Sequence, residues 1–197
     1  MVLSRRTLLA IMIGLVAGRR LGAAAGQTGL EGFTLAGPPC TPDERATPAV
    51  PADASYRPGA PERSSLVERG VVGTPLTWSG TVTGLTCGRV KGALVEVWQA
   101  DAHGVYGQSG FRLRGAQRTD ANGAFRFETI VPGATPGRAP HIGVHVVVAG
   151  KPDFWTELFF PNDPQNAKDA RFNPRLVLTM GGTATHRTGM FDLVLTM

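Results

Sequence analysis

The sequence predicts an all-β protein, on three observations. Among its 197 residues are 26 glycines and 15 prolines, a content typical of chains with many turns. The charged fraction of 18% fits a turn-rich β protein better than a helical one. Short apolar or alternating segments recur between Gly- and Pro-containing turns. We therefore expect a single antiparallel β-sandwich of about eight strands, preceded by an extended N-terminal arm.

The strands are predicted where apolar and polar residues alternate between turn signals. We expect strands at 76–84, 93–98, 125–130, 141–148, 155–160, 175–179 and 190–196. Residues 120–123 read Asp-Ala-Asn-Gly and predict a hairpin turn, because Asn-Gly readily adopts positive φ. Residues 164–170 are the one segment expected to be helical, over a turn or two. The sandwich is thus assigned to residues 74–197.

Residues 1–25 are predicted to form an export signal. Twin arginines, Arg5 and Arg6, precede an apolar run at 8–17, and an A-x-A cleavage site follows at 23–25. This arrangement resembles a twin-arginine signal, so we expect a periplasmic or secreted protein. The apolar run is shorter than the about 20 residues that a membrane span needs, so no span is expected after cleavage.

The charge of the chain also depends on this leader. Residues 1–25 contain four arginines and no acidic residue, so they supply most of the formal net charge of +5. The near-neutral remainder gives no electrostatic reason to expect a nucleic acid or an anionic membrane as a partner.

Residues 26–73 are rich in Pro, Gly, Ala and Ser and show no sustained period. We interpret them as an extended arm over the domain surface, with plain disorder as the alternative. The two cysteines, Cys40 and Cys87, permit one disulfide in an exported protein, or they are two unpaired thiols.

The segment 141–148 is the most informative strand. Side chains alternate between the faces of a strand, so Ile142 and Val144 belong to an apolar face, while His141, Gly143 and His145 share the other. His141 and His145 would lie roughly 13 Å apart at Cα, which makes it awkward for both to bind one ion.

The motifs of this region resemble those of the intradiol ring-cleavage dioxygenases, the catechol and protocatechuate 3,4-cleaving enzymes. Residues 132–143 read PGATPGRAPHIG, against a family pattern of P-G-x-Y-P-G-R-x-x-H-I-H. Residues 155–164 resemble the family's T-Q-x-Y-F-P-x-D-P, and Tyr106 in DAHGVY matches its first tyrosine. The likeness covers roughly residues 40–196.

The resemblance implies Fe(III) held by two tyrosines and two histidines. Tyr106 and His141 match one ligand of each kind, whereas Thr135 and Gly143 stand at the other two ligand positions. Arg138 matches an arginine that stabilises bound catecholate, and Glu157 replaces a glutamine near the site.

Three substitutes for the missing ligands are open. His145 could join His141 if the strand bulges at Gly143, because glycine in a strand often marks a bulge. Glu157 could complete a set of two histidines and one carboxylate, which would favour Fe(II). His103 is the third candidate, and binding of no metal at all is the remaining alternative.

The expected function is that of an exported, iron-dependent dioxygenase. Its substrates would be a small aromatic diol and O2, and the ring would open between the two hydroxyl-bearing carbons. The resemblance also implies that copies of the chain could assemble into a homo-oligomer. The alternative is a non-catalytic β-sandwich binding module derived from the same family.

Overall fold

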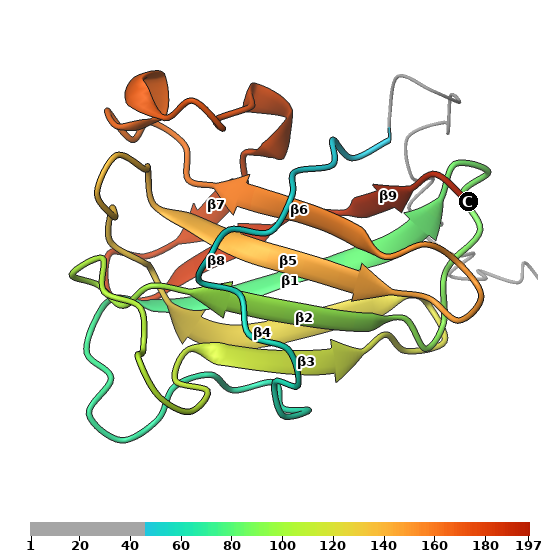
Figure 1. The fold of residues 1–197 in the computed structure, drawn as a ribbon, viewed down its shortest axis with the longest axis horizontal. Coiled ribbons are helices and arrows are strands. Elements are labelled where there is room, and N and C mark those ends of the chain that lie inside the picture. Colours follow the sequence, from blue (N-terminus) through green and yellow to red (C-terminus); the bar gives the residue numbers. More distant parts are fainter. Residues whose placement is uncertain (1–45) are drawn as a thin grey trace, which may run out of the picture. The chain divides into compact units, whose positions relative to one another are not determined.

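The computed structural model describes residues 46–197 (Figure 1). The predicted signal at 1–25, the first part of the arm and Cys40 lie outside the described residues. Cys87 takes part in a disulfide. No helix within residues 46–197 is long and apolar enough to cross a membrane.

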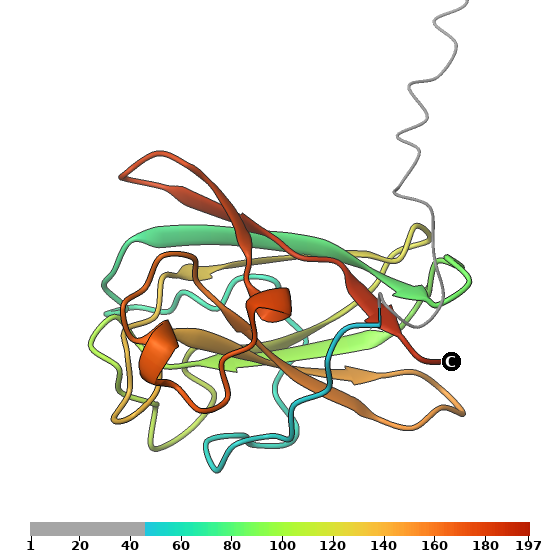
Figure 2. The same cartoon turned by 90° about the horizontal axis from the view of Figure 1, so that it is seen from above.

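The elements form two sheets that pack face to face, as the edge view in Figure 2 makes clear. In chain order they are β1 (Pro75–Gly84), β2 (Leu94–Gln99), β3 (Arg114–Arg118), β4 (Ala124–Ile130), β5 (His141–Val147), β6 (Phe154–Phe159), the 3-10 turns η1 (Asn166–Lys168) and η2 (Pro174–Leu176), β7 (Thr179–Gly182), β8 (Arg187–Met190) and β9 (Leu193–Leu195). One sheet has the order β4-β1-β8-β7, with β9 also paired to β1, and the other has the order β3-β2-β5-β6. The predicted β-sandwich is confirmed.

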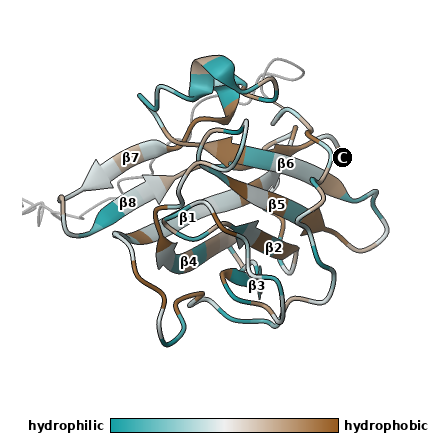
Figure 3. Ribbon diagram, turned by 60° about the vertical axis from the view of Figure 1, so that its left-hand side comes forward, coloured by the Kyte–Doolittle hydropathy of each residue, from teal (hydrophilic) through white to brown (hydrophobic). Residues whose placement is uncertain are grey.

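The core lies between the sheets and follows from strand alternation. Phe125 and Phe127 of β4 point inward while Arg126 and Glu128 point to solvent. Phe127 stacks on Trp78 of β1, with ring centroids 5.7 Å apart. The apolar face of β5 joins this core from the opposite sheet, through side chains that include Ile142, Val144 and Val146. In Figure 3, β2 is largely hydrophobic, whereas the segment that carries the 3-10 turns is mostly hydrophilic.

Strand β5 is buried on both faces, because residues 46–73 cover the outer face of its sheet. The blue segment in Figure 1 crosses in front of β6, β5 and β2. Backbone bonds fasten it along its length: Thr47 N donates to Val194 O, and Val50 N donates to Trp155 O, at 2.9 and 2.8 Å. Further along, Leu66 N donates to Glu128 O at 2.8 Å. The outer face that carries His141 and His145 is therefore an interior surface.

Several predicted elements need correction. Strand β3 was missed, because its sequence Arg-Gly-Ala-Gln-Arg carries no apolar alternation. The segment 175–179 does not form one strand. It covers the end of η2, which begins at Pro174, a residue without a backbone N–H for a ladder, and only its last residue, Thr179, belongs to a strand, β7. The segment 190–196 is divided between the end of β8 and the separate strand β9. The helix predicted at 164–170 is only a short 3-10 turn, η1.

Two expectations about strand pairing also change. Residues 120–123 form the expected turn, with Gly123 at φ 71° and Asp120 N donating to Ala124 O. The turn does not close a hairpin, however, because β3 pairs with β2 and β4 pairs with β1 in the other sheet. The pairing is also not wholly antiparallel. The chain folds back between β7 and β8, so that β8 runs parallel to β1, as β9 does.

The arm should contribute to the stability of the sandwich. Leu66 is 1% exposed and belongs to the main core, whereas its neighbour Val67 is 45% exposed. We expect Leu66→Ala to lower the free energy of unfolding by about 2–5 kcal/mol. The matched control Val67→Ala should change it by no more than about 0.5 kcal/mol. Urea denaturation measures both, and equal effects would show that the arm is not part of the folded core.

Candidate metal and substrate site

Two loops at one end of the β3-β2-β5-β6 sheet hold the residues that the sequence motifs single out. The loop after β2 is closed by Asp101, whose Oδ1 accepts from the backbone N–H groups of His103 and Val105 at 2.9 and 3.0 Å. The carbonyl of Asp101 accepts from Gly133 N at 2.8 Å, which joins this loop to the one before β5. A Cβ at Gly104 would lie 1.9 Å from Ala134 O, so the two loops approach too closely for any other residue. This contact brings Tyr106 towards His141.

Tyr106 and His141 meet at hydrogen-bonding distance. The Tyr106 hydroxyl lies 3.0 Å from His141 Nε2. His141 Nδ1 lies 2.7 Å from the carbonyl of Ala139, and because a carbonyl only accepts, Nδ1 is the nitrogen that carries the proton. Nε2 is therefore free to accept the tyrosine proton or to bind a metal, the arrangement usual for ligating histidines.

The arm adds Asp53, a residue that the sequence interpretation did not select. Asp53 Oδ2 lies 3.5 Å from His141 Nε2, and Oδ1 accepts from Ser55 N, Ser55 Oγ and Trp98 Nε1. Burial raises the pKa of Asp53, but the contact with the His141 imidazole and the hydrogen bonds from Ser55 and Trp98 outweigh burial and hold that pKa well below its usual range. The one local signal was the Asp-Ala-Ser spacing of an Asx turn, which marks a turn and not a ligand.

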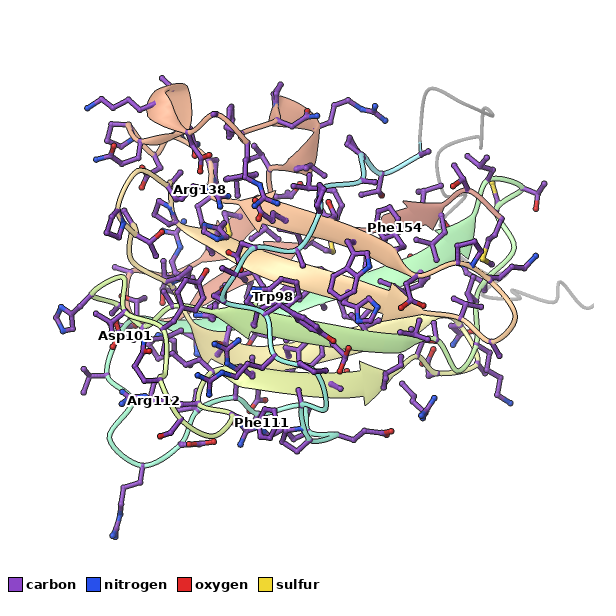
Figure 4. The ribbon with its side chains drawn as sticks, in the orientation of Figure 1. Trp98, Asp101, Phe111, Arg112, Arg138 and Phe154 are labelled. Atoms are coloured by element: carbon purple, nitrogen blue, oxygen red, sulfur yellow. The ribbon has the colours of Figure 1, made fainter. Side chains whose placement is uncertain are left out.

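Trp98 occupies the space next to Gly143, where the family motif has its second histidine. A Cβ built at Gly143 would lie 2.1 Å from Trp98 Cε2. Strand β5 passes this point without a bulge, with Gly143 opposite Trp98 on one side and Glu157 on the other. The expectation that a bulge at Gly143 brings His145 to the site is therefore wrong. Figure 4 shows Trp98 near the centre of this face and Arg138 towards the 3-10 turns.

Glu157 and Arg138 form a buried ion pair at the edge of the site. Arg138 Nη2 donates to Glu157 Oε2 at 2.5 Å, and its Nε donates to both oxygens of Asp169 at 3.0 and 2.9 Å. Burial lowers the pKa of Arg138, but the two carboxylates outweigh burial and raise it overall. Glu157 is 0% exposed, and its Oε1 has an ion-pair contact with Arg171 at 3.1 Å but no hydrogen bond in the described structure. Glu157 thus keeps one oxygen available to a further partner.

His145 belongs to a separate cluster and not to the group around His141. Its Nδ1 lies 2.6 Å from Glu96 Oε2 and its Nε2 lies 3.0 Å from Asp153 Oδ2. Its ring stacks on Trp155 at 3.6 Å between centroids. Tyr56 of the arm donates to Glu96 at 3.1 Å, so this cluster fastens the arm to the sheet. His103 is exposed and does not join either cluster.

The gathered groups suit a hard, highly charged cation. Asp53, His141 and Glu157 each present one ligand atom, and these atoms all lie within 4.8 Å of one another. Burial, together with the Asp53 and Glu157 carboxylates, raises the pKa of Tyr106 to about 12. A cation among these groups would reverse that effect and favour the phenolate. Phenolate and carboxylate oxygens with one imidazole fit Fe(III), which prefers hard donors.

Comparison with known proteins identifies the family of this chain. The model of a family described as Dioxygenase matches residues 56–155, half of the chain. The chain therefore belongs to the family of intradiol ring-cleavage dioxygenases.

Two curated relatives are similar over part of their length. A 6-chlorohydroxyquinol 1,2-dioxygenase of Cupriavidus pinatubonensis is 32% identical over 145 residues, which are 61% of this chain and 52% of that protein. Catechol 1,2-dioxygenase 1 of Acinetobacter lwoffii is 45% identical over 65 residues, which are 29% of this chain and 21% of the relative. The chain thus spans about half the length of the first of these relatives and a fifth of the second.

Two solved structures are also similar to this chain. The dioxygenase domain of a dioxygenase carbohydrate-binding protein fusion from Streptomyces sp. SirexAA-E is 42% identical, with a TM-score of 0.74 over 77% of this chain and 98% of that one. The catechol 1,2-dioxygenase from Acinetobacter sp. ADP1 is 25% identical, with a TM-score of 0.68 over 77% of this chain and 63% of that one.

The packing of Trp98 on Gly143 leads to a testable prediction. In Gly143→Ala the new methyl group must displace the indole, so we expect a loss of about 1–3 kcal/mol in the free energy of unfolding. The tryptophan emission should change at the same time. Gly189→Ala is the matched control, because a Cβ there finds its nearest neighbour at 3.4 Å. Equal losses in the two variants would contradict the close packing at Gly143.

Asp169 should make stability depend on acid pH. Burial raises the pKa of Asp169, but bonds from Arg171 N, Ala139 N and Arg138 outweigh burial and lower it overall. A depressed pKa gives stability that is present above the unfolded-state value of about 3.9 and is lost as pH falls further. Asp169→Asn should therefore be less stable than the wild type by about 1–3 kcal/mol at pH 7.

That difference should shrink below about pH 4, as the wild-type carboxylate becomes protonated. Denaturation between pH 3 and pH 7 measures it. Lys168→Met, a change at an exposed neighbour, should alter stability little at any pH in this range. A difference between Asp169→Asn and the wild type that stays constant with pH would contradict the assignment.

Proposed function

We propose that this protein is an iron-dependent dioxygenase that opens a catechol-type ring between its two hydroxyl-bearing carbons. One O2 would be consumed for each ring, and both oxygen atoms would enter a ring-opened dicarboxylate. The observation that carries the proposal is the convergence of Tyr106 and His141 at 3.0 Å from separate segments of the chain. Membership of the intradiol family supports the same reaction class.

The metal would be Fe(III), held by Tyr106 and His141 with the carboxylates of Asp53 and Glu157. These carboxylates would take the place of the second tyrosine and second histidine, whose positions are Thr135 and Gly143. When bound, the ferric ion would supply the Lewis acidity and redox capacity that activate an aromatic diol towards O2. A set with one imidazole and three oxygens is harder than the family's own set and still suits Fe(III).

The protein groups around this site have separate tasks. The Ala139 carbonyl fixes the ring of His141 through Nδ1 and so aims Nε2 at the site. Arg138 orients the carboxylate of Glu157 through the bond at 2.5 Å. Arg138 Nε also donates to Asp169. Because Arg138 is bonded to these two carboxylates, its effect on a bound diolate would be electrostatic. Trp98 fills the space beside Gly143 and keeps water from that side.

We also propose that the protein is exported before it acts, to the periplasm or outside the cell. The twin arginines and the apolar run of residues 1–25 support this location. A twin-arginine route carries folded proteins, which would allow iron to be loaded first.

Metal analysis and visible spectroscopy on protein from iron-rich medium test the function. We expect about one iron per chain and a broad visible band, from Tyr106 to the metal, that shifts when catechol is added. Tyr106→Phe should abolish the band. His141→Ala and Asp53→Ala should each weaken iron binding by about 10- to 100-fold or more, since loss of a supporting contact alone typically has an effect of this size.

His145→Ala serves as the control, because its ring is held by Glu96 and Asp153, away from the site. It should retain iron, although the loss of its buried bonds should reduce stability. Protein that remains colourless after reconstitution and takes up no oxygen with any catechol would overturn the proposal.

A further inference from the structure

An open groove lies where the main core reaches the surface of the sandwich, and its volume is about 400 Å³. Small-molecule sites commonly have volumes of about 300–1,000 Å³ and mostly apolar walls. The walls here include Val131, Phe160, Pro161 and Met180. Phe160 belongs to the main core, and Val131 and Met180 pack against it. The residues proposed as metal ligands are not among those that line the groove, so it is a separate feature of the molecule.

Arg187, the first residue of β8, faces inward at this groove. It pairs with Leu76 of β1, which is a buried core residue, and paired residues of neighbouring strands share a face of the sheet. Alternation along β8 agrees, because Gly189 is buried while Thr188 and Met190 are exposed. Among the described residues that line the groove, Arg187 alone is charged. A cation thus stands on the face of the sheet that otherwise builds the core.

The guanidinium of Arg187 has no partner in the part of the chain that the structure describes. It takes part in no hydrogen bond and no ion pair with any of the residues 46–197. Gly182 lies opposite Arg187 on β7 and offers no side chain. Taking a cation out of water is unfavourable unless an anion pairs with it. An inward-facing guanidinium with apolar walls beside it therefore favours an anion that comes from outside the chain.

We propose that this groove is a second ligand site, which binds a small monocarboxylate with a compact apolar body and pairs its carboxylate with Arg187. The proposal goes beyond the dioxygenase function and does not depend on iron. Guanidinium and carboxylate match in geometry and form paired, charge-assisted hydrogen bonds. The apolar body would lie against Phe160 and Met180, and the flexible thioether of Met180 adapts to ligands of different shape. A neutral analogue would leave the guanidinium unpaired, and a hydrated anion such as phosphate would gain nothing from the apolar walls.

The first test needs no variant. Calorimetry on the purified full chain compares cyclohexanecarboxylate with cyclohexylmethanol, two probes that share the apolar ring and differ in charge. We expect the acid to bind at least about tenfold more tightly, as a charged hydrogen bond predicts. Equal affinity for the two probes, or no binding of the acid, would overturn the proposal. Inorganic phosphate that binds as tightly as the acid would overturn it as well.

The second test uses variants of one sheet. Arg187→Met should remove the preference for the acid, while Arg187→Lys, which keeps the charge but not the planar fork, should retain part of it. Arg126→Met is the matched control, because Arg126 lies on the outer face of the same sheet and pairs with Glu128. It should bind the acid as the wild type does. An arginine side chain can also cover apolar surface while its charge stays in water, and an unchanged affinity in Arg187→Met would show this passive role and contradict the proposal.

A third measurement locates the bound acid and keeps this site apart from the metal site. Backbone amide NMR spectra of the iron-free full chain are recorded with and without cyclohexanecarboxylate. We expect the largest shift changes at Phe160, Met180 and Arg187, whether or not the protein cleaves any catechol. Changes centred on Tyr106 and His141 instead would place the acid in the metal site and overturn the proposal. An active dioxygenase without shifts at the groove would overturn the second site alone.

Discussion

The contact between the indole of Trp98 and the backbone at Gly143 determines the form of the site. With the ring so close, no side chain fits on β5 at this position, and the strand passes without a bulge. A histidine at position 143 is thereby excluded for steric reasons. The Nε1–H of the same indole donates to Asp53 Oδ1 at 3.3 Å. Trp98 therefore fills the space beside Gly143 and also orients the nearby carboxylate of Asp53. One tryptophan thus excludes a side chain at position 143 and orients the carboxylate that we propose as a ligand.

The two carboxylates of the site are compensated unequally. Asp53 and Glu157 lie around His141 and Tyr106, and both raise the pKa of the phenol. Arg138 and Arg171 compensate Glu157, but Asp53 has only neutral donors and the imidazole. Buried carboxylates at this spacing repel one another, and a metal ion is the usual means by which proteins hold such groups together. The electrostatics of the site thus support the metal centre that we propose.

Sequence patterns predicted those parts of the structure that depend on local alternation or on a contiguous motif. Strands β4 and β5 carry clear alternation, and the motifs at 101–106 and 132–143 singled out Tyr106 and His141, which lie 3.0 Å apart in the structure. Strand β3 was missed because Gly115 is buried against Leu66 of the arm, a contact between segments far apart in the chain. Asp53 was missed for the same reason, since its role comes from where the arm crosses the sheet. Local periodicity contains no information about such crossings.

The arm makes the site and the His145 cluster interdependent, although they share no residue. Asp53 reaches His141 while Tyr56, three residues later, reaches Glu96 and lies against Trp155, at 4.7 Å between ring centroids. Trp98 lies between them and contacts both arm residues. A displacement of the arm at Tyr56 would therefore withdraw Asp53 from His141. The contacts of Tyr56 with Glu96 and Trp155 thus help to set the position of Asp53 beside His141.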